Sequence, residues 1–353
     1  MESASIPARP PRARGELVRE FISKFGLIAV LLILPVVYGI QDLQDDGDLS
    51  RLATNIKDGL SNGAIWALIA VGYTLVYGII ELINFAHGDL FMLGSFVAFS
   101  LMGTIGLTTA TGGIGLFFGL LLIMLIAMVA CGTLNTMIER VGYRPLRSAP
   151  RLAPLITAVG FSFILQNVGL LWLGGSHRGV PDLIESQERL VTIVGVPITH
   201  GDVLAVAVGV PLFLFLLNVV NFTRIGRAMR ATAQDPQAAR LMGINVDTTI
   251  SFTFLLGGMM AGAAGLIYAL YQTDVWFFAG FTAGLIAFTA AVMGGIGNIK
   301  GAALGGLVIG MIQQISDNRI GTEWTPAIVF AYLILILVFR PQGLIGEQTR
   351  EAG

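Results

Sequence analysis

The chain has 353 residues, of which 55% are hydrophobic and only 12% charged, and its formal net charge is -1. An ordinary soluble domain carries about 25% charged residues, so this composition argues against a soluble enzyme, a nucleic-acid-binding protein and a disordered scaffold. The single cysteine, Cys131, lies in an apolar run, which excludes a disulfide framework and a multi-cysteine metal site.

Apolar runs of about 15–22 residues recur along the chain, and this length suits α-helices that cross a bilayer. The predicted fold class is therefore all-α: a polytopic membrane protein with about 8–10 transmembrane helices, some of them short or broken. Two of the runs, 281–293 and 302–315, are too short to cross about 30 Å of hydrocarbon as straight helices, so we expect them to be re-entrant or discontinuous. The ten predicted spans are residues 25–40, 60–80, 91–107, 115–137, 152–173, 203–220, 250–271, 281–293, 302–315 and 324–339.

Positive charge predicts the orientation of these spans. If the N-terminus is cytoplasmic and the spans alternate, sixteen of the 21 Lys and Arg residues fall on the cytoplasmic side, in line with the positive-inside rule. Both termini are then cytoplasmic. We expect a basic cytoplasmic tail (residues 1–24), one transmembrane domain (25–340) with a cytoplasmic loop (221–249), and a cytoplasmic C-terminal tail (341–353). No signal-peptide cleavage site follows run 25–40, so we interpret this run as a retained span.

A short turn between the second and third predicted spans carries polar residues beside apolar flanks. Asn84 and His87 lie in it, followed by Gly88 and Asp89. A lone histidine at such a place is more often a structural hydrogen-bonding group than a proton relay. The three histidines of the chain show no metal-ligand spacing, so no metal site is expected.

Polar residues within the predicted spans are few. Gln166 and Asn167 lie in the fifth span, where polar groups face either a neighbouring helix or a cavity. Interhelical packing and hydrogen bonding are one interpretation, and lining a transport path is the other. The centres of the predicted spans carry no clear acidic residue, which argues against a proton- or sodium-coupled carrier.

The cytoplasmic loop 221–249 contains start and stop signals for one short helix. Asp235 is a favoured N-cap residue, Pro236 suits the first helical position, and Gly243 suits the residue after the last turn. A helix this short is marginal in water and needs a surface to dock against. It is either an ordinary loop helix beside anionic lipid headgroups or a docking helix for a cytosolic partner. Its intervening residues include Gln237, Ala238, Ala239, Leu241 and Met242.

Two further features accompany this helix. Ala238, Leu241 and Met242 form a small apolar face by helical spacing. The arginines that precede the helix, Arg224, Arg227 and Arg230, recur at intervals of three and form a basic stripe. On the first interpretation these arginines anchor the loop at the headgroups.

Glycine is abundant, with 45 residues, and some glycines recur at intervals of four. This spacing suits close contact between transmembrane helices. The glycine-rich stretch around residues 294–301 is not a phosphate-binding loop, because Lys300 is followed by glycine instead of Ser or Thr. The expected helix-packing positions are Gly258, Gly262, Gly297, Gly301 and Gly305.

Five stretches in this order resemble the permeases of branched-chain amino acid ABC importers of the LivH type. They are residues 63–88 with Ile83-Asn84-Phe85-Ala86-His87-Gly88, residues 143–147, 155–167, 226–245 and 287–306. The cytoplasmic coupling loop of that family has an E-A-A-x-x-x-G pattern. Residues 237–243 match it except that Gln237 stands in place of the acid.

The resemblance implies a transport subunit of a heteromeric importer in the bacterial plasma membrane, and not an enzyme. Its partners would be a second homologous permease, two ATP-binding cassette subunits and an extracytoplasmic substrate-binding protein. ATP would be used by the cassette subunits, and this chain would bind no cofactor, metal or nucleic acid. The short helix at Asp235–Gly243 would dock the ATPase. Asn84, His87, Gln166 and Asn167 would lie near the path between the two permeases.

Branched-chain amino acids are the leading substrate by this resemblance. The alternative within the same fold is import of urea or short amides. A self-sufficient channel or secondary carrier belongs to a different class, and the capped short helix and the missing acid argue against it. An intramembrane enzyme would need a nucleophile–base pair or a metal cluster in the spans, and the sequence suggests neither.

Overall fold

The computed structural model describes residues 14–45, 47–147, 149–150, 152–193 and 195–346. The predicted tails lie mostly outside the described residues: residues 1–13 of the first and 347–353 of the second are not among them. Apolar runs fold here as helices because each helix satisfies its own backbone hydrogen bonds without water. The principal helices are α1 (Arg14–Asp45), α2 (Ser50–Ile80), α3 (Ala86–Ile105), α4 (Gly113–Ile138), α5 (Leu152–Leu173), α6 (His200–Phe222), α7 (Arg224–Gln234), α8 (Pro236–Leu241), α9 (Val246–Gln272), α10 (Ala279–Gly294), α11 (Ile299–Arg319) and α12 (Thr325–Phe339).

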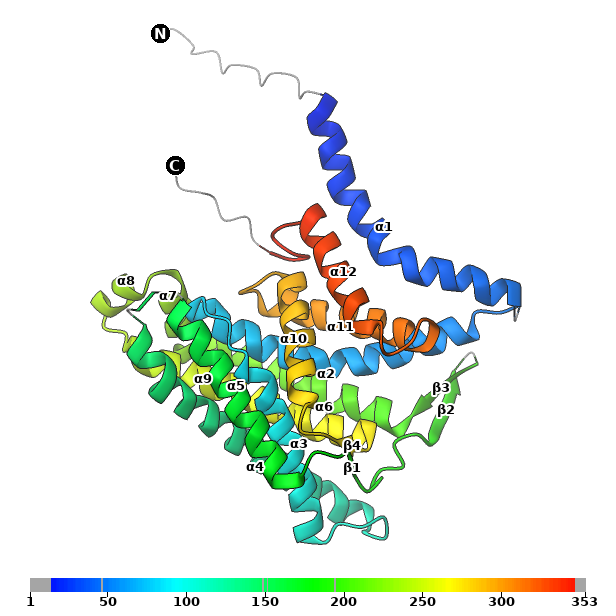
Figure 1. Ribbon diagram of the computed structural model, residues 1–353, viewed down its shortest axis with the longest axis horizontal. Helices are drawn as coiled ribbons and strands as arrows, with labels where there is room; N and C mark the ends of the chain where they lie inside the picture. Colours follow the sequence, from blue (N-terminus) through cyan, green and yellow to red (C-terminus); the bar gives the residue numbers. More distant parts are fainter. Residues whose placement is uncertain (1–13, 46, 148, 151, 194, 347–353) are drawn as a thin grey trace.

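Short elements complete the described chain. Helix α4 continues into a π-helical turn, η1 (Glu139–Tyr143), and a 3₁₀ turn, η2 (Arg144–Leu146). Two small antiparallel ladders lie at the opposite end of the molecule from α8, as Figure 1 shows. They pair β1 (Arg178–Gly179) with β4 (Asp274–Val275), and β2 (Arg189–Ile193) with β3 (Val196–Thr199).

The ten predicted spans correspond in order to α1–α6 and α9–α12, so the all-α polytopic fold is confirmed. In the described part of the chain, seven helices are long and apolar enough to cross a membrane: α2, α3, α4 with its continuation, α5, α6, α9 and α11. Helices α10 and α12 are apolar but shorter, with 16 and 15 residues. The chain is a multi-pass helical membrane protein.

Two sequence-based boundaries are wrong. The run 302–315 was expected to be too short for a straight span, but α11 has 21 residues because the helix continues through the polar stretch to Arg319. The third span was expected to begin at residue 91, but α3 begins at Ala86. His87, Gly88 and Asp89 therefore lie buried in its first turn instead of in a surface turn.

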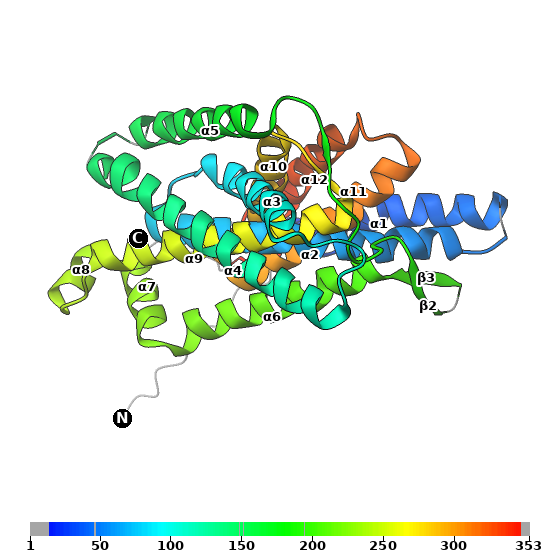
Figure 2. The same ribbon diagram turned by 90° about the horizontal axis from the view of Figure 1, so that it is seen from below.

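Helices α2 and α9 form the centre of the molecule, and α4, α5 and α6 lie around them (Figures 1 and 2). The middle of α2 is buried almost continuously from Ser61 to Val76. The outer helices instead expose large apolar side chains such as Phe117 on α4 and Leu171 on α5. Lipid or another subunit can cover such surfaces, which water cannot solvate favourably.

Glycines let the central helices approach closely. A Cβ atom on Gly63 of α2 would lie 2.8 Å from the Cα of Leu307 on α11. On α9, a Cβ atom on Gly258 would lie 2.8 Å from the Cβ of Asn135, and one on Gly262 would lie 2.9 Å from the carbonyl carbon of Ala127, both on α4. The small-residue spacing thus marks real helix contacts here.

The remaining predicted packing glycines give a mixed result. Gly301 and Gly305 of α11 contact the backbone of α10 at Gly294 and Ala290, as expected. Gly297 does not pack between helices: it lies in the turn between α10 and α11 with φ +87. Its requirement for glycine comes from the left-handed backbone, which side chains with a Cβ rarely adopt.

Candidate functional site

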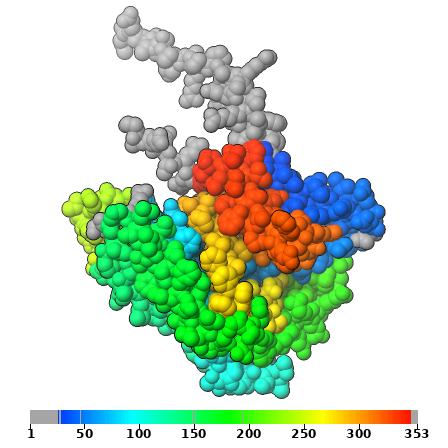
Figure 3. All heavy atoms as spheres, viewed as in Figure 1, coloured from blue at the N-terminus to red at the C-terminus, as the bar shows by residue number. Residues whose placement is uncertain are grey.

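Helix α8 is the short helix that the sequence predicts, and it projects at one edge of the molecule (Figure 3). The carboxylate Oδ1 of Asp235 accepts hydrogen bonds from the N–H groups of Gln237 at 2.8 Å and Ala238 at 3.0 Å. Pro236 occupies the first helical position, and Gly243 has φ +81 just beyond the helix end. Local hydrogen bonding thus fixes both ends of this helix.

One exposed face of α8 is apolar, whereas the exposed Gln237 and Arg240 of the same helix line the hollow described below. Leu241 and Met242 are 89% and 82% exposed, and Ala238 is exposed beside them. Ala239 is only 4% exposed and packs toward the rest of the chain, so it is not part of this face. A docking partner on this surface would therefore contact Ala238, Leu241 and Met242, and Ala239 would hold the helix in place.

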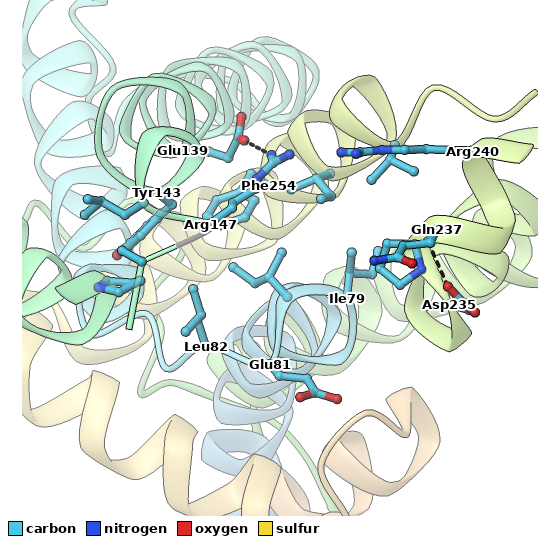
Figure 4. A pocket seen from close by; sticks show the side chains of 17 residues that line it. Ile79, Glu81, Leu82, Glu139, Tyr143, Arg147, Asp235, Gln237, Arg240 and Phe254 are labelled. Atoms are coloured by element: carbon cyan, nitrogen blue, oxygen red, sulfur yellow. Dashed lines mark hydrogen bonds and ion pairs between the residues drawn. The ribbon is translucent and has the colours of Figure 1, made fainter. Parts of the chain in front are cut away.

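A hollow of about 730 Å³ lies beside α8, where the end of α2, the η1–η2 turns and the start of α9 meet. Arg147, the residue after η2, and Arg240 of α8 both line it, as Figure 4 shows. Its walls combine aliphatic side chains from α2 with Phe254 of α9. The lining residues are Ile79, Ile80, Glu81, Leu82, Glu139, Tyr143, Leu146, Arg147, Ala149, Pro154, Asp235, Pro236, Gln237, Arg240, Val246, Ile250 and Phe254.

An ion-pair cluster joins the η1–η2 segment to α9, and two of its members, Glu139 and Arg147, line this hollow. The guanidinium of Arg147 pairs with Glu139, and its Nη1 lies 2.5 Å from Oδ1 of Asp247. Arg144 Nη2 lies 2.8 Å from the other oxygen of Asp247, and Ser251 donates to Glu139 at 2.6 Å. Glu139 is fully buried, so its charge depends on these partners. No local sequence pattern predicts this cluster, because Asp247 lies 100 residues from Arg147 and Ser251 lies 112 residues from Glu139.

Asn84 lies in a second buried network, which joins the α2–α3 connection to α4 and α9. Tyr143 donates its hydroxyl to Oδ1 of Asn84 at 2.8 Å. The amide of Asn84 reaches Asn135 of α4 at 3.4 Å, and Asn135 donates to the carbonyl of Phe254 at 2.7 Å. Asn84 therefore links the α2–α3 connection to α4 and to the turn that follows it.

The other three predicted path residues have different surroundings: the backbone N–H of His87 donates to the carbonyl of Asn84 at 3.1 Å, whereas Gln166 and Asn167 lie on α5. Gln166 donates to Ser162 at 3.0 Å, and Ser162 donates to Asp89 of α3 at 2.5 Å. His87 is fully buried, with the ring of Tyr73 edge-on at 5.6 Å between centroids. Asn167 is exposed on α5, where its amide donates to a carbonyl one turn earlier. The structure does not bring the four residues together.

Asp89 lies inside a helix, where the sequence-based boundaries placed a turn. The predicted spans carried no clear acidic residue near a centre, because Asp89 was placed in a turn. Since α3 begins at Ala86, Asp89 is instead a fully buried carboxylate within a candidate span. Because Asp89 lies in the first turn of α3 and not near its centre, it does not contradict the argument against an ion-coupled carrier.

Comparison with known proteins identifies relatives over most of the chain. The sequence model described as "Branched-chain amino acid transport system / permease component" matches residues 55–338. LivH, the permease protein of a high-affinity branched-chain amino acid transport system, is 39% identical to this chain over 307 residues in Escherichia coli strain K12. The Salmonella typhimurium LivH is 39% identical over 305 residues. Each alignment covers 83% of this chain and 95% of the relative. The corresponding protein BraD of Pseudomonas aeruginosa is 37% identical over 306 residues, which are 84% of this chain and 96% of BraD.

Proposed function

Because the chain belongs to the family of branched-chain amino acid transport system permease components, we propose that it forms part of the membrane path of an ATP-driven importer for branched-chain amino acids. Membership makes the chain a transport subunit of a multi-component system and not an enzyme. The substrate is proposed from the names of relatives that are 37–39% identical. We propose the bacterial plasma membrane as its location.

The proposed orientation places α8 in the cytoplasm and the β2–β3 ladder outside. Figure 2 shows α7 and α8 at one end of the long helices and the ladder at the other. The α8 end also carries Arg144, Arg147, Arg224 and Arg227, in line with the positive-inside rule. In this orientation the transmembrane domain spans residues 25–340, with residues 221–249 as its coupling loop.

The exposed apolar face of α8 carries the proposal. Leu241 and Met242 are exposed at the end of a helix whose two ends are fixed by hydrogen bonds. We propose that this rigid apolar surface packs into a groove on an ATP-binding cassette subunit. Movement of α8 would pass to α9, where Asp247 is paired with Arg147 and Phe254 accepts from Asn135. Two cassette subunits would use ATP, a second permease would complete the path, and an extracytoplasmic binding protein would deliver the substrate.

The test uses the assembled importer with Leu241→Ser and Met242→Ser combined. We expect normal membrane insertion, loss of the co-purifying ATPases and at least tenfold slower leucine uptake into vesicles loaded with ATP, because the polar side chains remove the apolar contact. Leu190→Ser, an exposed change on β2, is the matched control. Retention of the ATPases with normal uptake by the double variant would refute the role of α8. Uptake without ATP, or uptake abolished by collapse of the proton gradient alone, would refute ATP-driven import.

A further inference from the structure

Helix α7 turns across the end of α6 instead of continuing it. The hydroxyl of Thr223 accepts from the N–H of Gly226 at 3.1 Å and caps the new helix. The guanidinium of Arg230 donates to the carbonyl of Val220, which ties the middle of α7 back to the last turn of α6. Figure 2 shows α7 running across the direction of the long helices. The helix thus lies at the level where α6 leaves the candidate membrane span.

The two faces of α7 differ in chemistry. Gly226, Met229 and Thr232, spaced by three, are buried against the rest of the chain. Arg224 and Arg227 are exposed, and neither side chain has a hydrogen bond or ion pair with any described residue. One face of α7 is thus held by the protein, and its cationic face is left free to contact charged groups outside the chain.

The free arginines border a hollow between α7 and α8. Its volume is about 440 Å³, and its floor is apolar. The acid that faces it is Asp235, whose Oδ1 already accepts two backbone hydrogen bonds from α8. The cations therefore outnumber the acid here. Ala238 and Met242 of the α8 segment also line this hollow.

We propose that this hollow binds the headgroup phosphate of an anionic phospholipid through Arg224 and Arg227. The inference rests on the proposed function for the cytoplasmic position of this end. Phe222, the last residue of α6, is 76% exposed immediately before the arginines and offers a contact for an acyl chain. Guanidinium groups bind phosphate oxygens in paired hydrogen bonds, and anionic lipids are enriched on the cytoplasmic leaflet.

A phospholipid suits this surface better than an acidic patch of the ATPase. The arginines begin directly at the end of a span, beside an exposed phenylalanine, whereas the projecting face of α8 is apolar. The sequence left lipid anchoring and partner docking as alternatives for one loop. In the structure the free arginines lie on α7 and the exposed Leu241 lies on α8, while Ala238 and Met242 border both surfaces.

The test measures the phospholipid retained by the purified importer after reconstitution in equal parts of phosphatidylcholine and phosphatidylglycerol. We expect the wild-type importer to retain more phosphatidylglycerol than phosphatidylcholine. Each single variant, Arg224→Gln or Arg227→Gln, should lower this enrichment about fivefold. Lys substitutions at both positions should keep most of it. Arg189→Gln removes an exposed arginine at the opposite end, on β2, and should change nothing.

Three results would overturn the proposal. Equal enrichment on the wild type and the double Gln variant would show that the arginines do not bind lipid. Abolition of the enrichment by inorganic phosphate would indicate a site for free anions. Loss of the ATPases from the double variant, with phosphatidylglycerol still enriched, would assign the arginines to the ATPase contact. This experiment measures retained lipid and not transport. A negative result would therefore refute lipid binding without deciding the proposed function, which the uptake experiment tests separately.

Discussion

Tyr143 donates its phenolic hydroxyl to Oδ1 of Asn84 at 2.8 Å, across 59 residues of sequence. Tyr143 closes the π-helical turn after α4, and Asn84 lies in the connection that leads into α3. Both side chains are buried, so the bond decides how these two segments meet beside the hollow at α8.

Tyr143→Phe should therefore destabilise the protein. The change leaves Oδ1 of Asn84 buried without this donor, which should lower the free energy of unfolding by about 1 kcal/mol. Thermal unfolding of the detergent-purified chain measures the effect. Tyr77→Phe is the control, because the Tyr77 hydroxyl has no hydrogen bond with the described residues. Equal melting temperatures for both variants would show that the bond contributes nothing.

Arg147→Gln should be more damaging than the loss of an exposed arginine. Glu139 is fully buried and paired with Arg147, so the variant leaves a buried carboxylate without its cation. We expect a loss of about 3 kcal/mol, largely restored when Glu139→Gln is added. Arg140→Gln, on the exposed side of the same turn, should change stability by less than about 0.5 kcal/mol. A double variant no more stable than Arg147→Gln would contradict this account.

Gly63→Ala should disturb the crossing of α2 and α11. The added Cβ atom would lie 2.8 Å from the Cα of Leu307, so the helices must separate. We expect a destabilisation of about 1–3 kcal/mol, seen as a lower melting temperature and as aggregation in size-exclusion chromatography. Gly160→Ala on α5 meets no atom within 4 Å and should be neutral or slightly stabilising. If both variants behave alike, close packing at this crossing is not required.

Gly243→Val should misplace α8 by backbone strain alone. Gly243 has φ +81, and its added Cβ would meet nothing within 4 Å, so the penalty of about 1–2 kcal/mol comes from the left-handed backbone. Gly243→Asn should retain most function, because asparagine tolerates this conformation. Co-purification of the ATPases and leucine uptake report the difference. Similar loss in both variants would point to a need for space and not for backbone freedom.

Reporter fusions should place the α1–α2 connection and the α7–α8 connection on opposite sides of the membrane. A fusion after Asp48 should report the outside, and one after Gln234 should report the cytoplasm, because the positive charges cluster around α7, α8 and η2. Each fusion should be made with an alkaline phosphatase and with a fluorescent protein, so that a positive signal is available on either side. Location of both sites on one side would overturn the proposed topology.

Much of the secondary structure could be predicted from the sequence, because it depends on neighbouring residues. The apolar runs placed ten helices in the correct order, since a helix satisfies its backbone within four residues. The ends of α8 were predictable for the same reason: Asp235 caps N–H groups two and three residues away, and Gly243 ends the same short segment. The helix-packing roles of Gly258 and Gly262 followed from their spacing.

The tertiary structure alone decided how the polar residues are grouped. Ser251 reaches Glu139 across 112 residues, and Arg147 reaches Asp247 across 100, so no local pattern could pair them. The inward direction of Ala239 likewise depends on where α7 and α9 pack against α8. A buried charge must find its partner in space, and that partner is set by which helices meet. Sequence spacing therefore determined the helices and caps of this protein, and packing determined which residues form its hollow and its ion-pair cluster.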